Sequence, residues 1–381
     1  HATSKDLLHW EEQPIAMYPD PLGEMFSGSA IIDKENTAGF GGDAMVAIYT
    51  AAGRIAQQCL AYSNDGGETF VKYQNNPVLD LSPAANWARD PKVFWYEPGK
   101  HWVMVLYQNN AIATYTSKDL KDWTYGGSTH GFHECPELFQ LPVDNNANVC
   151  KWVMYGASGT YMIGDFDGIK FTPESGKHHY VDGDFYAAQT FSNVPDDRTI
   201  QMAWANIEHP NMPFKGMMLF PQELFLSETP DGIRLFSRPI NEIEQLHTNS
   251  RRWFDCDEKE LNKHLETVNG DLLHIKMDVE ITNLHSCKLN FKGQTILNFN
   301  GNHNKVNNFP YSGELNNLNR FQAEIIIDRT SVEIYLDGGK LFLANRLNPV
   351  NDQGLDISGV RNDKVNLKIH AFEVHEMKSI W

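Results

Sequence analysis

A short polar turn recurs along the first part of this chain. It reads SKDLLHW at residues 4–10 and SKDLKDW at 117–123, with related versions at 63–70, 165–171 and 227–235. In chain order the five copies start 59, 54, 48 and 62 residues apart. That spacing holds about four short strands with their turns, which is the size of one propeller blade. The chain is therefore predicted to be all-β, with a five-bladed β-propeller whose first blade is incomplete.

The composition of these turns has a physical basis. Short Ser, Asp and Asn side chains accept hydrogen bonds from neighbouring backbone N–H groups, and glycine supplies the positive φ that tight turns need. The aromatic residue that follows packs the hairpin onto its sheet. Ordinary hairpin turns of any all-β protein are the alternative, but five units in near register favour a true repeat.

Strand signals dominate the sequence up to about Leu246. Short apolar runs bounded by Gly, Pro, Asn or Asp predict strands, among them residues 45–49, 92–96, 101–107, 151–155 and 200–204. We assign residues 1–246 to the propeller.

The pattern changes after the propeller. A polar stretch at 247–262 fits a short helix or a linker, and we assign it as a linker. Beyond it, alternating runs at 272–281 and 321–336 end in a DGG hairpin turn at 337–339. Since this region contains no propeller turn, residues 263–381 are predicted to form a separate antiparallel β-sandwich.

Charge and composition exclude several classes of partner. The 32 Lys and Arg residues against 49 Asp and Glu residues give a net charge of −17, without a basic cluster. Nucleic acid and anionic membranes are therefore disfavoured, and a neutral ligand is favoured. No apolar run approaches the roughly 18 residues of a membrane span. The five cysteines are widely spaced and predict neither a disulfide framework nor a zinc site, so no cofactor or metal is expected.

Two carboxylates stand out by their settings. Asp90 lies in WARDPKVFW at residues 87–95, and Glu134 lies in HECPELF at 133–139. Each acid directly precedes a strand and has a proline close behind it that restricts the backbone. Acids at the starts of successive innermost strands converge on the mouth of a propeller channel, where paired carboxylates catalyse glycoside chemistry. Either acid alone is also compatible with a structural cap at the entry to a strand.

Other catalytic signatures do not fit. The HECP sequence superficially resembles a zinc site, but no Cys-x-x-Cys follows it and no histidine stands four residues after His133. No Gly-x-Ser-x-Gly elbow or phosphate-binding glycine loop is present.

Four motifs in series carry a family resemblance. They are FSGS at 26–29, RDP at 89–91, ECP at 134–136 and FYAAQTF at 185–191. This series resembles that of glycoside hydrolase family 32, the β-fructofuranosidases. Segments in the propeller and sandwich regions extend the resemblance over nearly the whole chain, namely HWEEQPIA at 9–16, PQEL at 221–224 and DRTSVEIY at 328–335.

The resemblance implies a role for each matching residue. Glu134 corresponds to the general acid/base, whose pKa is expected to lie above that of a solvated glutamate. Asp90 corresponds to the carboxylate that holds fructose hydroxyls and stabilises the oxocarbenium-like transition state. The implied sugar-binding residues are Arg89, Phe26, Ser27 and Trp204. The implied substrates are levan, inulin or sucrose, with fructose released from chain ends, and the implied location is secreted or periplasmic.

One departure from the family concerns the nucleophile. Family members carry a Trp-Met-Asn-Asp-Pro-Asn-Gly segment whose Asp is the nucleophile, and these 381 residues do not contain it. Asp6 belongs to a peripheral turn and Asp20 lies between two prolines, so both are poor substitutes. A retaining mechanism needs two carboxylates about 5 to 5.5 Å apart, so we expect this chain to fold but to be inactive, with its first blade incomplete or completed by another chain.

Two alternatives remain open. One is a catalytically inactive fructan-binding fragment or pseudo-enzyme. The other is a different five-bladed propeller glycosidase, such as an inverting enzyme whose carboxylates are about 6.5 to 9.5 Å apart.

Overall fold

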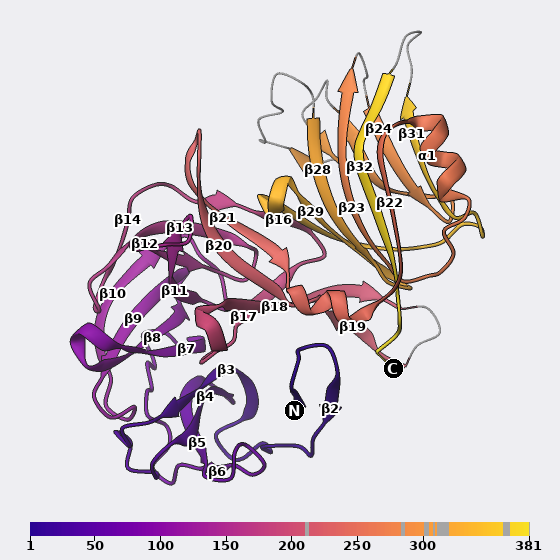
Figure 1. The fold of residues 1–381 in the computed structure, drawn as a ribbon. Coiled ribbons are helices and arrows are strands. Elements are labelled where there is room, and N and C mark those ends of the chain that lie inside the picture. The colour runs from indigo at the N-terminus through magenta and orange to yellow at the C-terminus, as the bar shows by residue number, and fades with distance from the viewer. Residues whose placement is uncertain are drawn as a thin grey trace. The chain divides into compact units, whose positions relative to one another are not determined.

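The computed structural model in Figure 1 shows a chain built almost entirely from strands. It describes residues 1–209, 213–282, 286–300, 305–307, 309–310, 320–360 and 366–380. The chain forms two compact units. The first comprises His1–His179, Tyr186–Ala203 and Phe225–Arg234, and the second comprises Tyr180–Phe185, Trp204–Leu224 and Leu235–Trp381. None of the described helices is long and apolar enough to cross a membrane.

The first unit contains antiparallel sheets that follow the chain order. A two-stranded sheet pairs β1 (Ala2–Ser4) with β2 (Trp10–Glu12). The next sheet has four strands, β3 (Glu24–Asp33), β4 (Ala44–Ala52), β5 (Ala56–Ser63) and β6 (Val71–Lys72). The sheet after it also has four, β7 (Arg89–Tyr96), β8 (His101–Gln108), β9 (Ala111–Ser117) and β10 (Thr124–His130), with η1 (Glu97–Gly99) between β7 and β8.

A ten-stranded sheet combines two further meanders. One consists of β11 (Glu137–Val143), β12 (Asn146–Tyr155), β13 (Thr160–Phe166) and β14 (Phe171–Pro173), with β15 (His178–His179) beside β13. The other consists of β17 (Tyr186–Thr190), β18 (Thr199–Glu208), β20 (Gln222–Thr229) and β21 (Gly232–Pro239), with β19 (Lys215–Met218) beside β18 and η2 (Pro195–Asp197) before it. A parallel bridge between Val143 and Leu226 joins the two meanders. All five apolar runs singled out in the sequence lie within these strands, which confirms them as strands.

Three of the repeated turns, at 4–10, 117–123 and 165–171, share the same hydrogen bonds from an aspartate to the backbone two and three residues on. In the first copy, Asp6 accepts backbone bonds from Leu8 and His9, each 2.9 Å long. In the third copy, Asp119 accepts the equivalent bonds from Lys121 and Asp122, at 3.0 and 2.9 Å. Each turn connects two adjacent strands of its sheet, and within the four meanders these are always the third and fourth strands. By this correspondence β1 and β2 are equivalent to the third and fourth strands of a meander.

The first strands of the meanders contact one another through side chains. Ser29 on β3 donates to the Pro91 carbonyl of β7 at 3.0 Å and accepts from the Val93 N–H at 3.0 Å. Gln189 on β17 donates to the Gly28 carbonyl of β3 at 3.1 Å. A buried ion pair, considered below, links β7 to β11 and β17. Strands β3, β7, β11 and β17 therefore surround a common centre within the first unit.

The second unit is a two-sheet sandwich. Its seven-stranded sheet has the order β16 (Val181–Gly183), β30 (Leu341–Arg346), β29 (Ser331–Leu336), β28 (Arg320–Ile327), β23 (Leu273–Thr282), β32 (Asn366–Met377) and β22 (His247–Asp257). Its five-stranded sheet has the order β27 (Phe309–Pro310), β26 (Lys305–Val306), β25 (Gln294–Asn300), β24 (Ser286–Phe291) and β31 (Leu355–Val360). Buried side chains from both sheets, including Ile275, Leu289 and Phe372, share one core, as expected for a sandwich.

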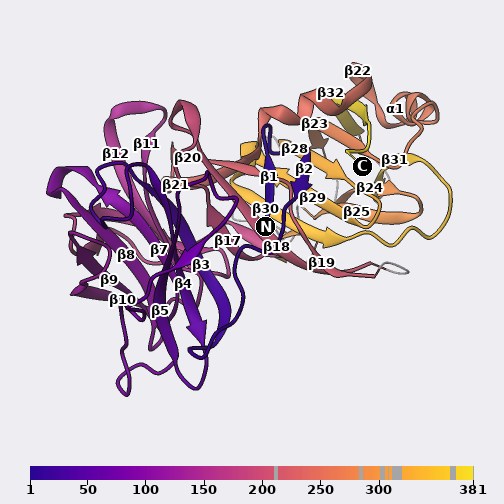
Figure 2. The same ribbon diagram turned by 90° about the horizontal axis from the view of Figure 1, so that it is seen from below.

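The segment suggested as a linker has regular structure. After η3 (Asn241–Leu246), residues 247–257 form β22, an edge strand paired along its length with β32. Helix α1 (Glu258–Leu265) follows, with Asp257 as its N-cap accepting from the Glu260 N–H at 2.8 Å. The helix lies beside β31, and Figure 2 shows it next to that strand. An edge strand is often polar because one of its sides faces water, so this sequence resembles a linker although it pairs with β32 along its length.

The predicted hairpin turn of the sandwich is confirmed. Strands β29 and β30 pair antiparallel and are joined by η4 (Asp337–Gly339). All three residues of this turn have positive φ, between 46° and 96°, which explains the pair of glycines.

Candidate active site

Asp90 and Glu134 lie where two neighbouring strands begin. Arg89 and Asp90 open β7, and Glu134 lies three residues before β11. The backbone is left-handed at Asp90 (φ 62°), Glu134 (48°) and Cys135 (41°). Such conformations are costly for residues other than glycine and persist only where the surroundings hold them. Their clustering at the two acids marks this region as a functional candidate.

Hydrogen bonds hold the strained backbone around Asp90. Its N–H donates to Thr50 Oγ1 at 3.0 Å, and Thr50 in turn donates to Gln58 Oε1 at 2.9 Å. The Asp90 carboxylate accepts from the Cys135 N–H at 3.1 Å. Because Cys135 follows Glu134, this last bond ties the two acids together through the backbone.

Arg89 connects both carboxylates directly. Its Nε donates to Glu134 Oε1 at 3.2 Å and lies 3.8 Å from Asp90 Oδ2, while its Nη2 makes a closer hydrogen bond to Glu134 Oε1. The guanidinium carbon also lies 4.7 Å from the centre of the Tyr107 ring, a cation–π contact. The predicted grouping of Arg89, Asp90 and Glu134 is therefore present in the structure.

Tyr186 is a member of this group that the sequence did not single out. It is the first residue of β17, and its hydroxyl donates to Glu134 Oε2. Burial and the neighbouring Glu134 raise the pKa of Tyr186, so the phenol remains a hydrogen-bond donor at neutral pH. The only sequence signal was its place in the FYAAQTF motif, which contains no carboxylate, histidine or other typical catalytic side chain.

The two carboxyls have opposite pKa shifts. Burial raises the pKa of Asp90, which is 5% exposed, and its bond from Cys135 and its neighbour Arg89 only partly offset this. Burial also acts to raise the pKa of Glu134, but the hydrogen bonds from Tyr186 and Arg89 outweigh it and leave that pKa below its ordinary value. The elevated pKa of Glu134 is expected in the working enzyme, whereas here two donors stabilise its ionised form and lower its pKa.

Tyr186→Phe is expected to raise the pKa of Glu134. The variant removes a donor to the carboxylate and leaves the effect of burial less opposed. A depressed carboxyl pKa stabilises the fold above the pKa of the unfolded chain, and that contribution is lost as the pH falls. The variant should therefore also lose less stability than the parent on acidification.

A carboxyl titration followed by ¹³C NMR, together with denaturation midpoints at several pH values, measures both effects. Tyr125→Phe is the matched control, because the Tyr125 hydroxyl contacts Ser128 on its own strand. An unchanged or lowered Glu134 pKa in Tyr186→Phe would contradict the assignment of Tyr186.

A buried ion pair lies behind the carboxylates. Lys92 Nζ is 3.1 Å from Glu137 Oε2 and donates to the Thr190 carbonyl and hydroxyl at 2.6 and 2.8 Å. The side chains of Lys92 and Glu137 are 7% and 0% exposed. Each member of this cluster follows a site residue closely in the chain. Lys92 comes two residues after Asp90 on β7, and Thr190 comes four residues after Tyr186 on β17. Glu137 comes three residues after Glu134 and is the first residue of β11. The cluster thus joins three strands of the site, since β7 carries Asp90, β17 carries Tyr186 and β11 begins shortly after Glu134.

The remaining predicted sugar-binding residues lie in different places. Phe26 and Ser27 are exposed at a β-bulge of β3, shortly before Ser29, which bonds to β7. They are therefore on the strand adjacent to Asp90. Trp204 on β18 belongs to the second unit, is 38% exposed and pairs with Met218. Its contact with the sugar stays a prediction.

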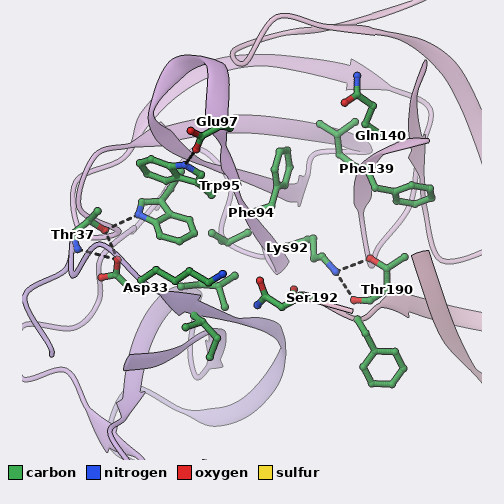
Figure 3. Close-up of a pocket in the computed structure, with 18 of the residues that line it drawn as sticks. Asp33, Thr37, Lys92, Phe94, Trp95, Glu97, Phe139, Gln140, Thr190 and Ser192 are labelled. Carbon is green, nitrogen blue, oxygen red and sulfur yellow. Dashed lines mark hydrogen bonds between the residues drawn. The ribbon is translucent and has the colours of Figure 1, made fainter. Parts of the chain in front are cut away.

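A cavity of about 800 Å³ lies along the same strands but does not include the carboxylates. Residues of β3, β7 and β11 line it, and Figure 3 shows Lys92 and Thr190 on one wall with Phe94, Trp95 and Phe139 nearby. On β7 and β11 its lining residues follow Asp90 and Glu134, so the cavity lies further along these two strands than the acids. In the described part of the chain, no cluster of three or more His, Cys, Asp or Glu side chains has metal-binding geometry.

Comparisons with known proteins give consistent matches for this chain. The profile described as the glycosyl hydrolases family 32 N-terminal domain matches residues 1–239. The levanase of Bacillus subtilis is 35% identical over 438 aligned positions that cover all of this chain and 64% of that protein. This chain thus spans less than two thirds of that relative. An extracellular exo-inulinase of Meyerozyma guilliermondii is 31% identical and covers 99% of this chain and 86% of that protein.

Solved structures share the fold. A fructofuranosidase from Schwanniomyces occidentalis, complexed with fructosylnystose, superposes with a TM-score of 0.86 at 25% identity, covering 100% of this chain and 88% of that one. An exo-inulinase from Aspergillus awamori superposes with a TM-score of 0.84 at 24% identity, covering 100% and 90%.

Proposed function

We propose that this chain, which belongs to glycosyl hydrolase family 32, provides the fructose-binding and acid/base part of a β-fructosidase. The reaction is the hydrolytic release of terminal fructose from levan, inulin or sucrose with retention of configuration. The observation that carries the proposal is the contact of one guanidinium, Arg89, with both Asp90 and Glu134. This contact holds together the two carboxylates that match the family's acid/base and its fructose-binding acid, and the retaining mechanism needs a further carboxylate as the nucleophile.

Each member of the group has a separate role in the proposed reaction. Glu134 protonates the leaving oxygen and then activates the hydrolytic water. Asp90 binds fructose hydroxyls, and Arg89 orients both acids and binds the sugar. Phe26 and Ser27 contribute to the fructose-binding wall, and contact of Trp204 with the sugar stays a prediction.

The lowered pKa of Glu134 must be reversed when the reaction begins. A second carboxylate next to Glu134 raises its pKa by like-charge repulsion, and a bound sugar does so by excluding water. In this proposal the nucleophile therefore has two effects, since it attacks the anomeric carbon and keeps Glu134 protonated.

The family's nucleophile segment is not found in these 381 residues. We therefore expect them to bind fructose without turning over its glycosides until a carboxylate is supplied in that position. An inactive fructan-binding protein would also bind without turnover. The presence or absence of a nucleophile therefore decides between a fructan hydrolase and an inactive fructan-binding protein. The family match speaks against a propeller glycosidase of another family.

The four meanders, together with β1 and β2, support a propeller with residues 1–246 as its domain. We assign its meanders as blades, with β1 and β2 as the third and fourth strands of the first blade. The sandwich begins within residues 247–262. Because the relatives include proteins named extracellular exo-inulinases, we propose a location outside the cell membrane.

Calorimetry with fructose, in parallel with sugar release from levan, tests the proposal. The protein of 381 residues should bind fructose and release none, and Arg89→Leu should abolish binding. Fusion of the two missing strands of the first blade, which include the Trp-Met-Asn-Asp-Pro-Asn-Gly segment, at the N-terminus should produce fructose release, and the same fusion with Ala for the Asp should not. Absence of fructose binding would overturn the proposed site. Hydrolysis by the 381 residues alone would overturn the requirement for an additional carboxylate.

A further inference from the structure

Trp87 is exposed next to the proposed active site. It is 53% exposed, compared with 38% for Trp204. Its loop leads directly into β7, so it lies two residues before Arg89 and three before Asp90. A large apolar side chain in this position leaves much hydrophobic surface in water, and residues of this type dominate the affinity of binding sites when a ligand covers them.

Hydrogen bonds fix the backbone around Trp87. The Asn86 carbonyl accepts from the Ala56 N–H at 2.8 Å, and the Ala88 carbonyl accepts from Gln58 Nε2 at 2.7 Å. The Trp87 carbonyl itself accepts from Arg89 Nη1 at 2.9 Å. Three consecutive carbonyls are thus bonded to donors from three different residues. The Trp87 side chain therefore projects from a fixed backbone, and a ligand that contacts it does not have to order the loop.

Arg89 links the main chain of Trp87 to Glu134. One terminal nitrogen of its guanidinium bonds to the Trp87 carbonyl and the other bonds to Glu134 Oε1. A single guanidinium therefore separates the main chain of Trp87 from the proposed acid/base. Since Glu134 protonates the oxygen between the terminal fructose and the next sugar, a residue beside it is within reach of that next sugar.

We propose that Trp87 binds the sugar on the leaving-group side of the scissile bond. This role rests on the fructose site proposed above. It adds a binding position for the second sugar, which a fructoside has and free fructose lacks. The indole face packs on the C–H face of a neutral sugar ring, which requires no charge and suits fructan and sucrose equally. Trp87 is in this view a specificity residue rather than a member of the acid/base group.

Calorimetry of the 381-residue protein with fructose, sucrose and the trisaccharide kestose tests this role. Trp87→Ala should weaken sucrose and kestose binding by about three- to tenfold, the range of a single aromatic contact, and should leave fructose binding unchanged. Trp87→Phe should recover most of the loss, because it restores an aromatic face. Phe254→Ala is the matched control, since Phe254 is 61% exposed in the sandwich, and it should change none of the three affinities.

The outcomes separate the role of Trp87 from the proposed function. Equal affinity of Trp87→Ala and the parent for kestose, with fructose still bound, would overturn the role of Trp87 alone. Equal weakening of all three sugars would also overturn it, because the effect would then act through Arg89 or the loop. If the parent binds none of the sugars, both the fructose site and the role of Trp87 are wrong.

Discussion

Glu134→Gln is expected to lower turnover by about two to four decades, the usual contribution of a positioned general acid. The measurement needs a protein that combines these residues with the nucleophile segment. Glutamine keeps the size and hydrogen-bonding capacity of the side chain, so Arg89 and Tyr186 retain a partner and fructose binding should persist. What is lost is the proton for the leaving oxygen. Steady-state rates on sucrose and levan give the magnitude.

A substrate with an acidic leaving group provides the control for this prediction. Such a group departs without protonation, so Glu134→Gln should be impaired much less in the step that forms the fructosyl-enzyme. A single-turnover measurement isolates that step. An equal loss with both kinds of substrate, or near-normal turnover on sucrose, would show that Glu134 is not the acid.

Lys92→Met is expected to destabilise the first unit by about 3 to 5 kcal/mol, the typical cost of removing one partner of a buried ion pair. The variant leaves Glu137 buried opposite a methionine, without its cation. Burial already raises the pKa of Glu137, and Lys92 opposes that effect. The destabilisation should therefore decrease as the pH falls, because protonation of Glu137 removes the uncompensated charge. Urea denaturation at several pH values measures it.

The double variant Lys92→Met/Glu137→Leu separates the ion pair from general packing. Removal of both charges should recover most of the lost stability, since a buried pair is often replaceable by apolar residues. Lys100→Met serves as a surface control, because Lys100 and its partner Glu97 are 68% and 67% exposed, and no measurable loss is expected. If the double variant is as unstable as Lys92→Met, the cost does not arise from the unpaired carboxylate.

The double variant also tests whether the buried ion pair affects function as well as stability. The fructose affinity of the double variant tests whether the ion pair of Lys92 and Glu137 also positions Asp90 and Glu134. A stable double variant with weakened fructose binding would assign a positioning role to it. A stable variant with normal affinity would restrict Lys92 and Glu137 to the stability of the centre.

The sequence by itself predicted the local structure of this chain. The repeated turns were recognisable because their bonds run between residues two or three apart, as from Asp6 to Leu8 and His9. The five apolar runs of the first unit and the hairpin at 337–339 were also predicted, because each is marked by a short local pattern of apolar and turn residues. The pairing of Asp90 with Glu134 was also predicted, since each acid precedes a strand and a proline restricts its backbone.

Only the tertiary structure decided how the candidate site is held together. Tyr186 reaches Glu134 over 52 positions of sequence, and Lys92 reaches Thr190 over 98. No local pattern encodes such pairs, because they depend on how separate strands meet around the centre. The direction of the Glu134 pKa shift was likewise inaccessible, since it results from competition between burial and two donors brought in from other strands. Strand β22 was hidden for a related reason, because its polar sequence is stabilised by pairing with β32, more than a hundred residues later in the chain.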